Sequence, residues 1–294
     1  MQYLKTDHNF LGLEHEKHFA FEKSKVVIQA IPYEHSSSYL SGSDKGPQAI
    51  INASQYVEFY DEEIDKETCF ETGISTLEPL NFDGIVDEAA MHLIEQQTKT
   101  LLQQDKFIVS LGAEHTVSYG IVKAMNDKFE NLSVLQIDAH SDLRMSYQGS
   151  KWSHASVMAR VHDLDIPITQ IGIRAQCKEE ADLIKSSTNI HTWYAHQISN
   201  NLDWIQAAVN TLSDNVYITI DADGFDPSIM PAVGTAEPNG VLWHQAIALF
   251  KEVFKQKNVI AFDIVECAPK EGEILTEFNL AKLAYKLIGM KFLK

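Results

Sequence analysis

Short runs of β-branched and other apolar residues recur along the chain, with longer amphipathic stretches between most of them. Within a run the apolar residues are nearly continuous and do not alternate with polar ones. This pattern is typical of strands that are buried on both faces of a parallel sheet. It predicts strands at residues 25–31, 107–111, 133–137, 168–173, 190–193, 216–220 and 259–265.

The stretches between the strands carry apolar residues at intervals of three and four, which is the spacing of one helix face. Ala90, Ile94 and Leu101 illustrate this spacing within the helix predicted at 87–104. A further helix is expected to begin near Pro47, because the fixed backbone of proline suits a first helical turn. The remaining helices are predicted at residues 117–126, 154–162, 179–185, 202–212, 241–255 and 273–293.

Strands that alternate with helices need crossover connections, so the chain is predicted to form an α/β fold. The sheet would be mainly parallel and covered by helices on both faces. No low-complexity linker or internal repeat divides residues 25–294, which we interpret as one domain. Residues 1–24 are polar and aperiodic and are expected to form an N-terminal arm. The acidic stretch 60–85 is expected to be an irregular surface connection.

The charge of the chain limits the partners that it is expected to have. Its 24 basic and 41 acidic residues give a formal net charge of -17, which argues against binding nucleic acid or an anionic membrane. A small cationic substrate would be compatible with this charge. The cysteines are far apart and indicate neither a disulfide framework nor a thiolate zinc site. No apolar run has the length of a signal peptide or a membrane span, so the cytoplasm is the expected compartment.

Three of the predicted strands end in residues of the types that bind metal ions. In a parallel sheet the carboxyl ends of the strands lie along one edge, so residues far apart in the sequence can meet there. The residues are His115 after the second strand, Asp138, His140 and Asp142 after the third, and Asp221 and Asp223 after the sixth.

The composition of this set predicts its chemistry. Taken singly, an aspartate after a strand is more often a turn former, and a lone histidine is more often an ordinary polar residue. Four carboxylates and two imidazoles together suit a pair of oxygen-preferring divalent ions, and manganese is the first choice. Cobalt, nickel, iron and zinc stay open. Two adjacent ions can share a water molecule and lower its pKa, so hydrolysis is the expected reaction class.

Three segments of the chain together resemble the signature segments of the ureohydrolases, the family that includes arginase and agmatinase. They are Gly112-Ala113-Glu114-His115, Asp138-Ala139-His140-Ser141-Asp142 and the stretch from Asp221 to Ser228. The likeness extends from Val26 to about Leu287. It implies a three-layer α/β/α sandwich, the arginase/deacetylase-like fold, and two manganese ions in each chain.

The resemblance also implies which residues hold each ion. One manganese would be bound by His115, Asp138, Asp142 and Asp221, and the other by His140, Asp138, Asp221 and Asp223. Asp138 and Asp221 would then bridge the two ions. In this family a hydroxide between the ions attacks the carbon of a guanidinium group, and urea leaves.

Other site residues are assigned from the same resemblance. His154 matches the histidine thought to pass a proton to the leaving amine. Glu266 matches the glutamate that pairs with the guanidinium, a role that suits a carboxylate because it accepts paired hydrogen bonds. Glu237 lies in a loop that resembles an agmatinase segment, with Asn239 in place of a usual glycine. We therefore predict His154, Glu266 and Asp142 as catalytic residues, and Glu266, Glu237 and His154 as substrate-binding residues.

The segment from Leu143 to Trp152 is the part expected to select the substrate. It lacks the arginase pattern and is similar to the agmatinase version. The expected reaction therefore converts agmatine to putrescine and urea, a step of polyamine biosynthesis. Arginine, aminopropylagmatine, guanidinobutyrate and formiminoglutamate stay open as substrates. Members of the family commonly form trimers or hexamers, so a homo-oligomer is expected.

Two functions of other classes are compatible with the same fold. A metal-dependent deacetylase would use a single zinc, and the large ligand set argues against this. A non-catalytic member that regulates an active paralogue would usually have lost a ligand, whereas the sequence retains the whole set. The ureohydrolase interpretation is therefore preferred.

Overall fold

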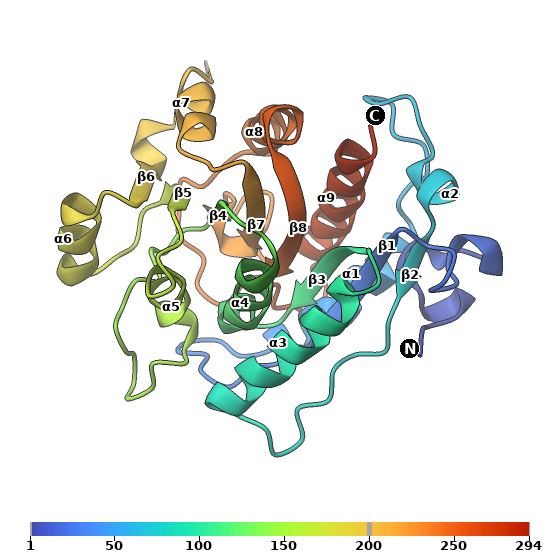
Figure 1. Cartoon of the computed structure of the whole chain (residues 1–294), viewed down its shortest axis with the longest axis horizontal. Coiled ribbons are helices and arrows are strands. Elements are labelled where there is room, and N and C mark those ends of the chain that lie inside the picture. Colours follow the sequence, from blue (N-terminus) through green and yellow to red (C-terminus); the bar gives the residue numbers. More distant parts are fainter. Residues whose placement is uncertain (1, 199–201, 294) are drawn as a thin grey trace.

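An eight-stranded sheet in which every strand is parallel to its neighbours forms the centre of the protein (Figure 1). The computed structural model describes residues 2–198 and 202–293. The strands run in the order β2-β1-β3-β8-β7-β4-β5-β6. They are β1 (Val26–Ile31), β2 (Ile74–Thr76), β3 (Phe107–Gly112), β4 (Leu132–Ile137), β5 (Ile168–Ile173), β6 (Ile190–Tyr194), β7 (Asn215–Asp221) and β8 (Asn258–Val265).

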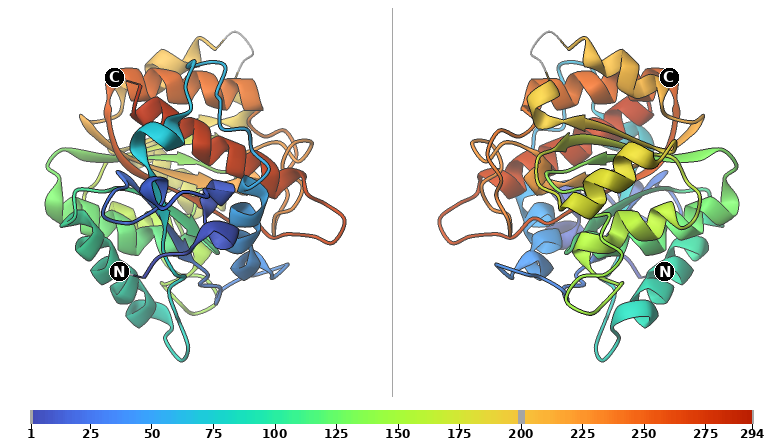
Figure 2. Two further views of the ribbon diagram at one scale, coloured as in Figure 1. Left: turned by 90° about the vertical axis from the view of Figure 1, so that its right-hand side faces the viewer. Right: turned by 90° about the vertical axis from the view of Figure 1, so that its left-hand side faces the viewer.

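Helices cover both faces of this sheet, as two side views show (Figure 2). Residues of α1, α7, α8 and α9 pack into the core on one face, and residues of α3, α4 and α5 pack into the core on the other. The helices are α1 (Gly46–Ser54), α2 (Thr68–Thr72), α3 (Asp87–Leu102), α4 (Ser118–Lys128), α5 (Val157–His162), α6 (Lys178–Ser186), α7 (Trp204–Asn210), α8 (Trp243–Gln256) and α9 (Leu275–Lys291).

The two cores explain why the strands are apolar throughout. Successive side chains of a strand point to opposite faces of the sheet. In β1, Val26 and Ile28 accordingly lie in the core beneath α9, whereas Val27 lies in the core beneath α3. Every residue of β1 is buried. The predicted α/β fold, with a parallel sheet between two helical layers, is confirmed.

The prediction of an irregular connection at 60–85 is wrong for part of that range. Helix α2 and strand β2 lie within it, and β2 forms one edge of the sheet by pairing with β1. Strand β2 contains only Ile74, Ser75 and Thr76, all of them buried. So short a strand, with a single apolar residue, has no periodicity that could reveal it.

Residues 2–24 pack closely against the sheet and its helices. Phe10, Leu11 and Leu13 each expose 1% of their surface or less. The N–H group of Phe10 donates to the Thr76 hydroxyl at 2.8 Å, and that of Leu11 donates to the Ser54 hydroxyl at 2.8 Å. The segment that the sequence marked as an arm therefore supplies part of the hydrophobic core over β2 and α1.

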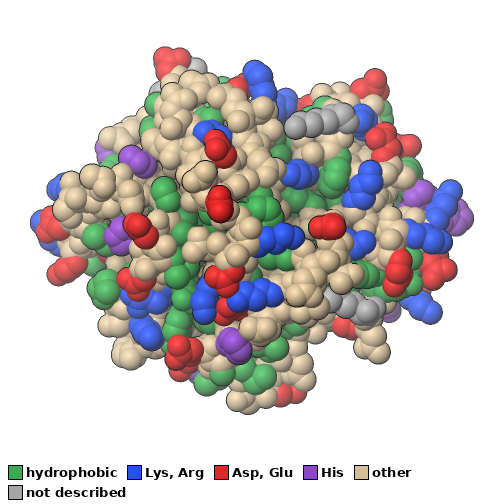
Figure 3. All heavy atoms as spheres, viewed as in Figure 1, with side chains coloured by type: hydrophobic (Ala, Val, Ile, Leu, Met, Phe, Trp, Pro, Cys, Tyr) green, Lys and Arg blue, Asp and Glu red, His purple; other side chains and the backbone are tan. Residues whose placement is uncertain are grey.

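Charged side chains of both signs are interspersed on the face of the molecule shown in Figure 3. The net negative charge is therefore not gathered into one continuous patch on this face. No helix within residues 2–198 and 202–293 has both the length and the apolar character that crossing a membrane would require.

A buried ion pair fixes α9 to the segment before α2, and its removal gives a test of the fold. Lys286 donates to both carboxylate oxygens of Asp61, at 2.8 and 3.0 Å. Their side chains are 5% and 8% exposed. Lys286→Ala leaves a buried carboxylate unpaired, so we expect it to lower the free energy of unfolding by about 3–5 kcal/mol.

Urea denaturation measures this loss, and Lys178→Ala is the matched control. Lys178 pairs with Asp182 on the surface of α6, where the two side chains are 73% and 56% exposed. An exposed pair contributes less than about 1 kcal/mol. Equal losses in the two variants would contradict the stabilising role of the buried pair.

Candidate metal centre and active site

Four neighbouring strands bring their carboxyl ends to one place. β3, β8, β7 and β4 are adjacent in the sheet, and His115, Glu266, Asp221 and Asp138 lie at or just beyond their ends. The loop after β7 also approaches the end of β4 very closely. A Cβ atom on Gly224 would lie 2.6 Å from the main-chain nitrogen of Asp138. Only glycine fits there, so this close approach depends on it.

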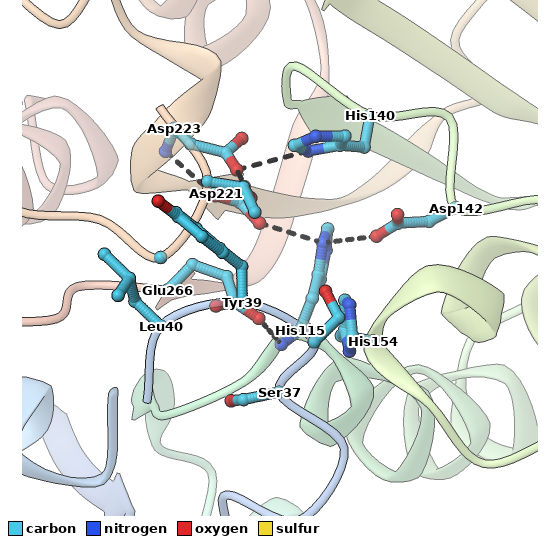
Figure 4. Close-up of a pocket in the computed structure, with 13 residues that line it drawn as sticks. Ser37, Tyr39, Leu40, His115, His140, Asp142, His154, Asp221, Asp223 and Glu266 are labelled. Carbon is cyan, nitrogen blue, oxygen red and sulfur yellow. Dashed lines mark hydrogen bonds and ion pairs between the residues drawn. The ribbon is translucent and has the colours of Figure 1, made fainter. Parts of the chain in front are cut away.

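The first group of ligand-type residues surrounds one imidazole nitrogen, and Figure 4 shows two of its carboxylates, Asp142 and Asp221. Carboxylate oxygens of Asp138 and Asp142 each lie 3.0 Å from His115 Nδ1, and an oxygen of Asp221 lies 3.3 Å from it. The His115 side chain is only 1% exposed. Three carboxylates thus converge on a single nitrogen that solvent barely reaches.

The other ring nitrogen of His115 is held by a buried chain of hydrogen bonds. The Thr219 hydroxyl donates to Asp263 at 2.6 Å, so its oxygen accepts the Nε2–H of His115 at 2.9 Å. Tyr217 donates to the second oxygen of Asp263 at 2.5 Å. These contacts keep a proton on Nε2 and orient Nδ1 toward the carboxylates. A metal-binding histidine is commonly oriented in this way.

The second group lies beside the first and shares Asp138 with it. His140 Nδ1 is 3.2 Å from an oxygen of Asp223 and 3.7 Å from Oδ1 of Asp138. Asp138 directs Oδ2 toward His115 and Oδ1 toward His140, as a ligand shared between two ions would. His115, Asp138 and Asp142 form one group that could hold a metal ion, and Asp138, His140 and Asp223 form another.

The charges of these groups favour a bound cation. Burial raises the pKa of Asp142 to about 7, and the neighbouring charge of Asp138 adds to the increase. Burial and the charge of Asp223 raise the pKa of Asp221 well above its usual range. For His140, burial lowers the pKa, but the carboxylates of Asp223 and Asp138 together outweigh the effect of burial and raise the pKa to about 12. Positive charge between the carboxylates relieves their repulsion.

One unsatisfied atom also fits the same conclusion. His115 Nδ1 finds no hydrogen-bond partner in the described part of the chain, although three carboxylates lie within 3.3 Å. A nitrogen that faces three anions is favourable only when a proton or a metal cation lies between them. Imidazole nitrogen and carboxylate oxygen together suit divalent ions such as manganese. The residues present therefore fit a pair of metal ions.

Glu266 connects the first group to the cavity. Its Oε1 accepts the main-chain N–H of His115 at 2.7 Å. Its backbone has a φ of 62°, and Asp142 has a φ of 53°. Burial raises the pKa of Glu266 well above its usual range, and the carboxylate of Glu114 adds to the increase. A cationic ligand such as a guanidinium would stabilise this carboxylate as an anion.

His154 and Glu266 both line the cavity above the two groups. Burial lowers its pKa to about 4, and the neighbouring His140 and His115 contribute to the decrease. The imidazole is therefore neutral at pH 7 and able to accept a proton. Its ring packs against that of Tyr147, with 5.7 Å between the centroids.

Two connected cavities open above the two groups. We call the first the inner cavity; its walls include His115, His140, Asp142, His154, Asp221, Asp223 and Glu266. Tyr39 and Leu40 stand at its mouth and are 77% and 45% exposed. The outer cavity is larger. It is lined by Arg144, Tyr147, Ala155, Ala175, Gln176 and Glu180 and shares Ser38, His140, Asp142, His154 and Thr235 with the inner one.

The structure brings most of the predicted residues together, and Glu237 is the exception. Glu237 is not among the residues that line either cavity, and its contact with substrate stays a prediction. Thr235 of the same loop lies at the wall and donates to Asp223 at 3.2 Å. Asn239, which replaces a usual glycine, has a φ of 66°. Asparagine tolerates this left-handed conformation, so the loop keeps its turn.

Arg174 is a residue that the sequence reasoning missed. Its guanidinium donates to the main-chain oxygens of Asp223, Phe225 and Glu237, at 2.6, 3.2 and 2.9 Å. It therefore fixes the loop after β7 to the loop that carries Thr235. The available signal was an arginine placed directly after a predicted buried strand.

Residues 24–289 of the chain match the Arginase family. The chain belongs to the arginase family. It is a ureohydrolase of that family, a hydrolase of amidino carbon–nitrogen bonds, as its resemblance to the ureohydrolases predicted.

Relatives in the family differ in the substrates that their names give. The N(1)-aminopropylagmatine ureohydrolase of Synechocystis sp. is 40% identical and aligns with 94% of this chain and 92% of its own. The agmatinase of Bacillus cereus is 34% identical and aligns with 86% of this chain and 87% of its own. The crystal structure of agmatine ureohydrolase of Thermoplasma volcanium superimposes with a TM-score of 0.81, at 28% identity, over 99% of this chain and 94% of its own.

Metal binding should stabilise the fold, because the ligand-type residues come from several strands. Manganese at 100 times its dissociation constant stabilises a protein by about 2.7 kcal/mol for one site. We expect the melting temperature to rise when manganese is added to chelator-treated protein and to fall again with EDTA. Differential scanning calorimetry measures both changes.

Asp138→Asn should abolish most of this increase, because Asp138 contacts both groups. Asp182→Asn, on the exposed surface of α6, should keep it. An increase of the same size in Asp138→Asn and the wild type would contradict the assignment of Asp138 to the metal centre.

Proposed function

We propose that this ureohydrolase acts with two divalent metal ions on an aliphatic guanidino-polyamine, of which N1-aminopropylagmatine is the first candidate and agmatine the second. The observation that carries the proposal is the pair of connected cavities above the two His/Asp groups. The inner cavity is walled by carboxylates that would attract a guanidinium, and the larger outer cavity would take a cationic tail.

Residues of both groups would hold the ions. His115, Asp142 and Asp221 would bind the first, His140 and Asp223 would bind the second, and Asp138 would bridge them. The proposal also includes that Asp221 is a second residue shared by both ions and that manganese is the native metal. Two bound divalent ions supply Lewis-acid activation of a water molecule at neutral pH. A single-zinc deacetylase is disfavoured because it would need only one of the groups.

Glu266 and His154, which both line the inner cavity, would contact the substrate. The carboxylate of Glu266 would accept hydrogen bonds from the guanidinium and hold its carbon over the metal centre. The oxygen of water bonds to that carbon, and the bond between the carbon and the alkyl nitrogen breaks. His154, neutral at pH 7, would take up the proton that water releases and deliver it to the leaving amine. The products are urea and the free amine.

The tail of the substrate would extend into the outer cavity. N1-aminopropylagmatine carries a further cationic amine beyond that of agmatine, and the carboxylate of Glu180 lies in the outer wall. Glu180 accepts N–H groups from Leu143 and Cys177 at 2.9 and 2.6 Å, so its position is fixed, and Nε of Arg144 lies 4.0 Å from it. The chain is more similar in sequence to the N(1)-aminopropylagmatine ureohydrolase of Synechocystis sp. than to the agmatinase of Bacillus cereus, which supports N1-aminopropylagmatine as the first candidate and agmatine as the second. The predicted homo-oligomer stays a prediction.

A urea-release assay on manganese-loaded protein tests the proposal. N1-aminopropylagmatine, agmatine and arginine are compared at equal concentrations. We expect kcat/KM to be greatest for N1-aminopropylagmatine, about tenfold lower for agmatine, and lowest for arginine, whose carboxylate would meet the acidic cavity. Absence of urea from all three, with two ions bound in each chain, would overturn the proposed function.

A larger residue in the outer cavity should separate the two polyamine substrates. Ala175 lines the outer cavity alone, so Ala175→Leu narrows the tail region and leaves the inner cavity unchanged. We expect kcat/KM for N1-aminopropylagmatine to fall about tenfold, with a smaller loss for agmatine. Ala236→Leu, at an exposed position, is the control. An equal loss for both substrates would argue against a tail in the outer cavity.

A further inference from the structure

Ser36, in the loop after β1, makes contacts that the proposed function has not used. It belongs to the run Ser36-Ser37-Ser38. Its hydroxyl oxygen lies 3.0 Å from His154 Nδ1 and also accepts the main-chain N–H of His154 at 3.0 Å. The same hydroxyl donates to Glu114 Oε2 at 3.0 Å. One serine thus connects His154 to a buried carboxylate.

The contacts of Glu114 fix the direction of this donation. Oε2 also accepts the main-chain N–H groups of Ser36, at 2.7 Å, and His35, at 3.2 Å. An oxygen that accepts two N–H groups is a poor position for a proton, and Oε1 is the other oxygen available to carry one. Oε2 therefore stays an acceptor whether Glu114 is ionised or not, and the Ser36 proton points to it.

The state of the His154 ring follows from the bonds already made. The only hydrogen of the Ser36 hydroxyl is used by Glu114, so the oxygen has only lone pairs left. One lone pair of the Ser36 oxygen accepts the main-chain N–H of His154. The other lone pair faces Nδ1 of the ring, and it can accept a hydrogen bond there only if Nδ1 is protonated. In a neutral imidazole the lone pair then lies on Nε2.

We infer that Ser36 is a positioning residue that holds His154 as the tautomer with its proton on Nδ1 and its lone pair on Nε2, the nitrogen left for the cavity. The inference rests on the proposed function, in which His154 accepts and delivers a proton. Glu114 anchors Ser36, and the ring of Tyr147 packs against His154 from another side. With Nδ1 occupied, every proton that His154 transfers passes through Nε2.

The tautomer can be read without turnover. The nitrogen chemical shifts of the two ring positions differ between tautomers, and they are measured by NMR on protein loaded with diamagnetic zinc. His154→Asn identifies the His154 signals by their loss. We expect the wild type to show the neutral tautomer with hydrogen on Nδ1, and Ser36→Ala to show a mixture. Hydrogen on Nε2 in the wild type, or no change in Ser36→Ala, would overturn the inference.

Kinetics test the consequence for the reaction. General acid–base catalysis contributes about 10²–10⁴-fold to a rate, and we expect Ser36→Ala to lower kcat by about 10²-fold with KM nearly unchanged. Ser36→Thr keeps the hydroxyl and should restore kcat, whereas Ser36→Val has the shape of threonine without the hydroxyl and should not. Ser41→Ala, an exposed serine of the same loop, is the control for loop changes.

The two inferences fail in different ways. If the wild type releases no urea, the proposed function fails, and the NMR measurement still decides the tautomer. If urea is released and Ser36→Val turns over as fast as Ser36→Thr, the positioning role of Ser36 is wrong and the proposed function stands. Because threonine and valine fill the same space, a folding defect common to both cannot imitate the expected difference.

Discussion

Repulsion between buried carboxylates at one edge of the sheet is the constraint that the rest of the structure accommodates. Carboxylate oxygens of Asp138, Asp142 and Asp221 lie within 3.3 Å of His115 Nδ1, and one of Asp223 lies 3.2 Å from His140 Nδ1. All four aspartates are nearly inaccessible to solvent. Such an arrangement opposes folding unless imidazolium or metal cations neutralise it. A parallel sheet tolerates it because the strands that carry the acids are fixed by extensive apolar cores on both faces.

Rigid contacts behind the acids keep them in place. His115 is held through Thr219 and Asp263, the loop after β7 is tied down by Arg174, and Gly224 permits that loop to approach the end of β4. Most of these contacts involve main-chain atoms or fully buried groups, which move little. The site is therefore built into the framework of the sheet, whereas the loops that carry Tyr39, Leu40 and Met145 are widely exposed.

Much of this arrangement was predictable, for physical reasons that also explain the failures. Long apolar runs identify buried strands, and metal-binding residue types that recur at strand ends indicate a shared site. Strand β2 gave no such signal because it is short and largely polar. The loop that carries Glu237 brings Thr235 to the cavity wall, whereas the role predicted for Glu237 stays a prediction. The contacts of Ser36 arise from residues far apart in the sequence, which no local pattern can relate.

The backbone at Asp142 and Glu266 has a consequence for engineering this enzyme. Both residues adopt positive φ, a conformation that costs on the order of 1–3 kcal/mol for residues other than glycine. Glycine would relieve that strain while removing the carboxylate of Asp142 or of Glu266. A selection for thermal stability alone would therefore favour the loss of two carboxylates that the proposed function requires, and stabilising libraries should keep both residues fixed.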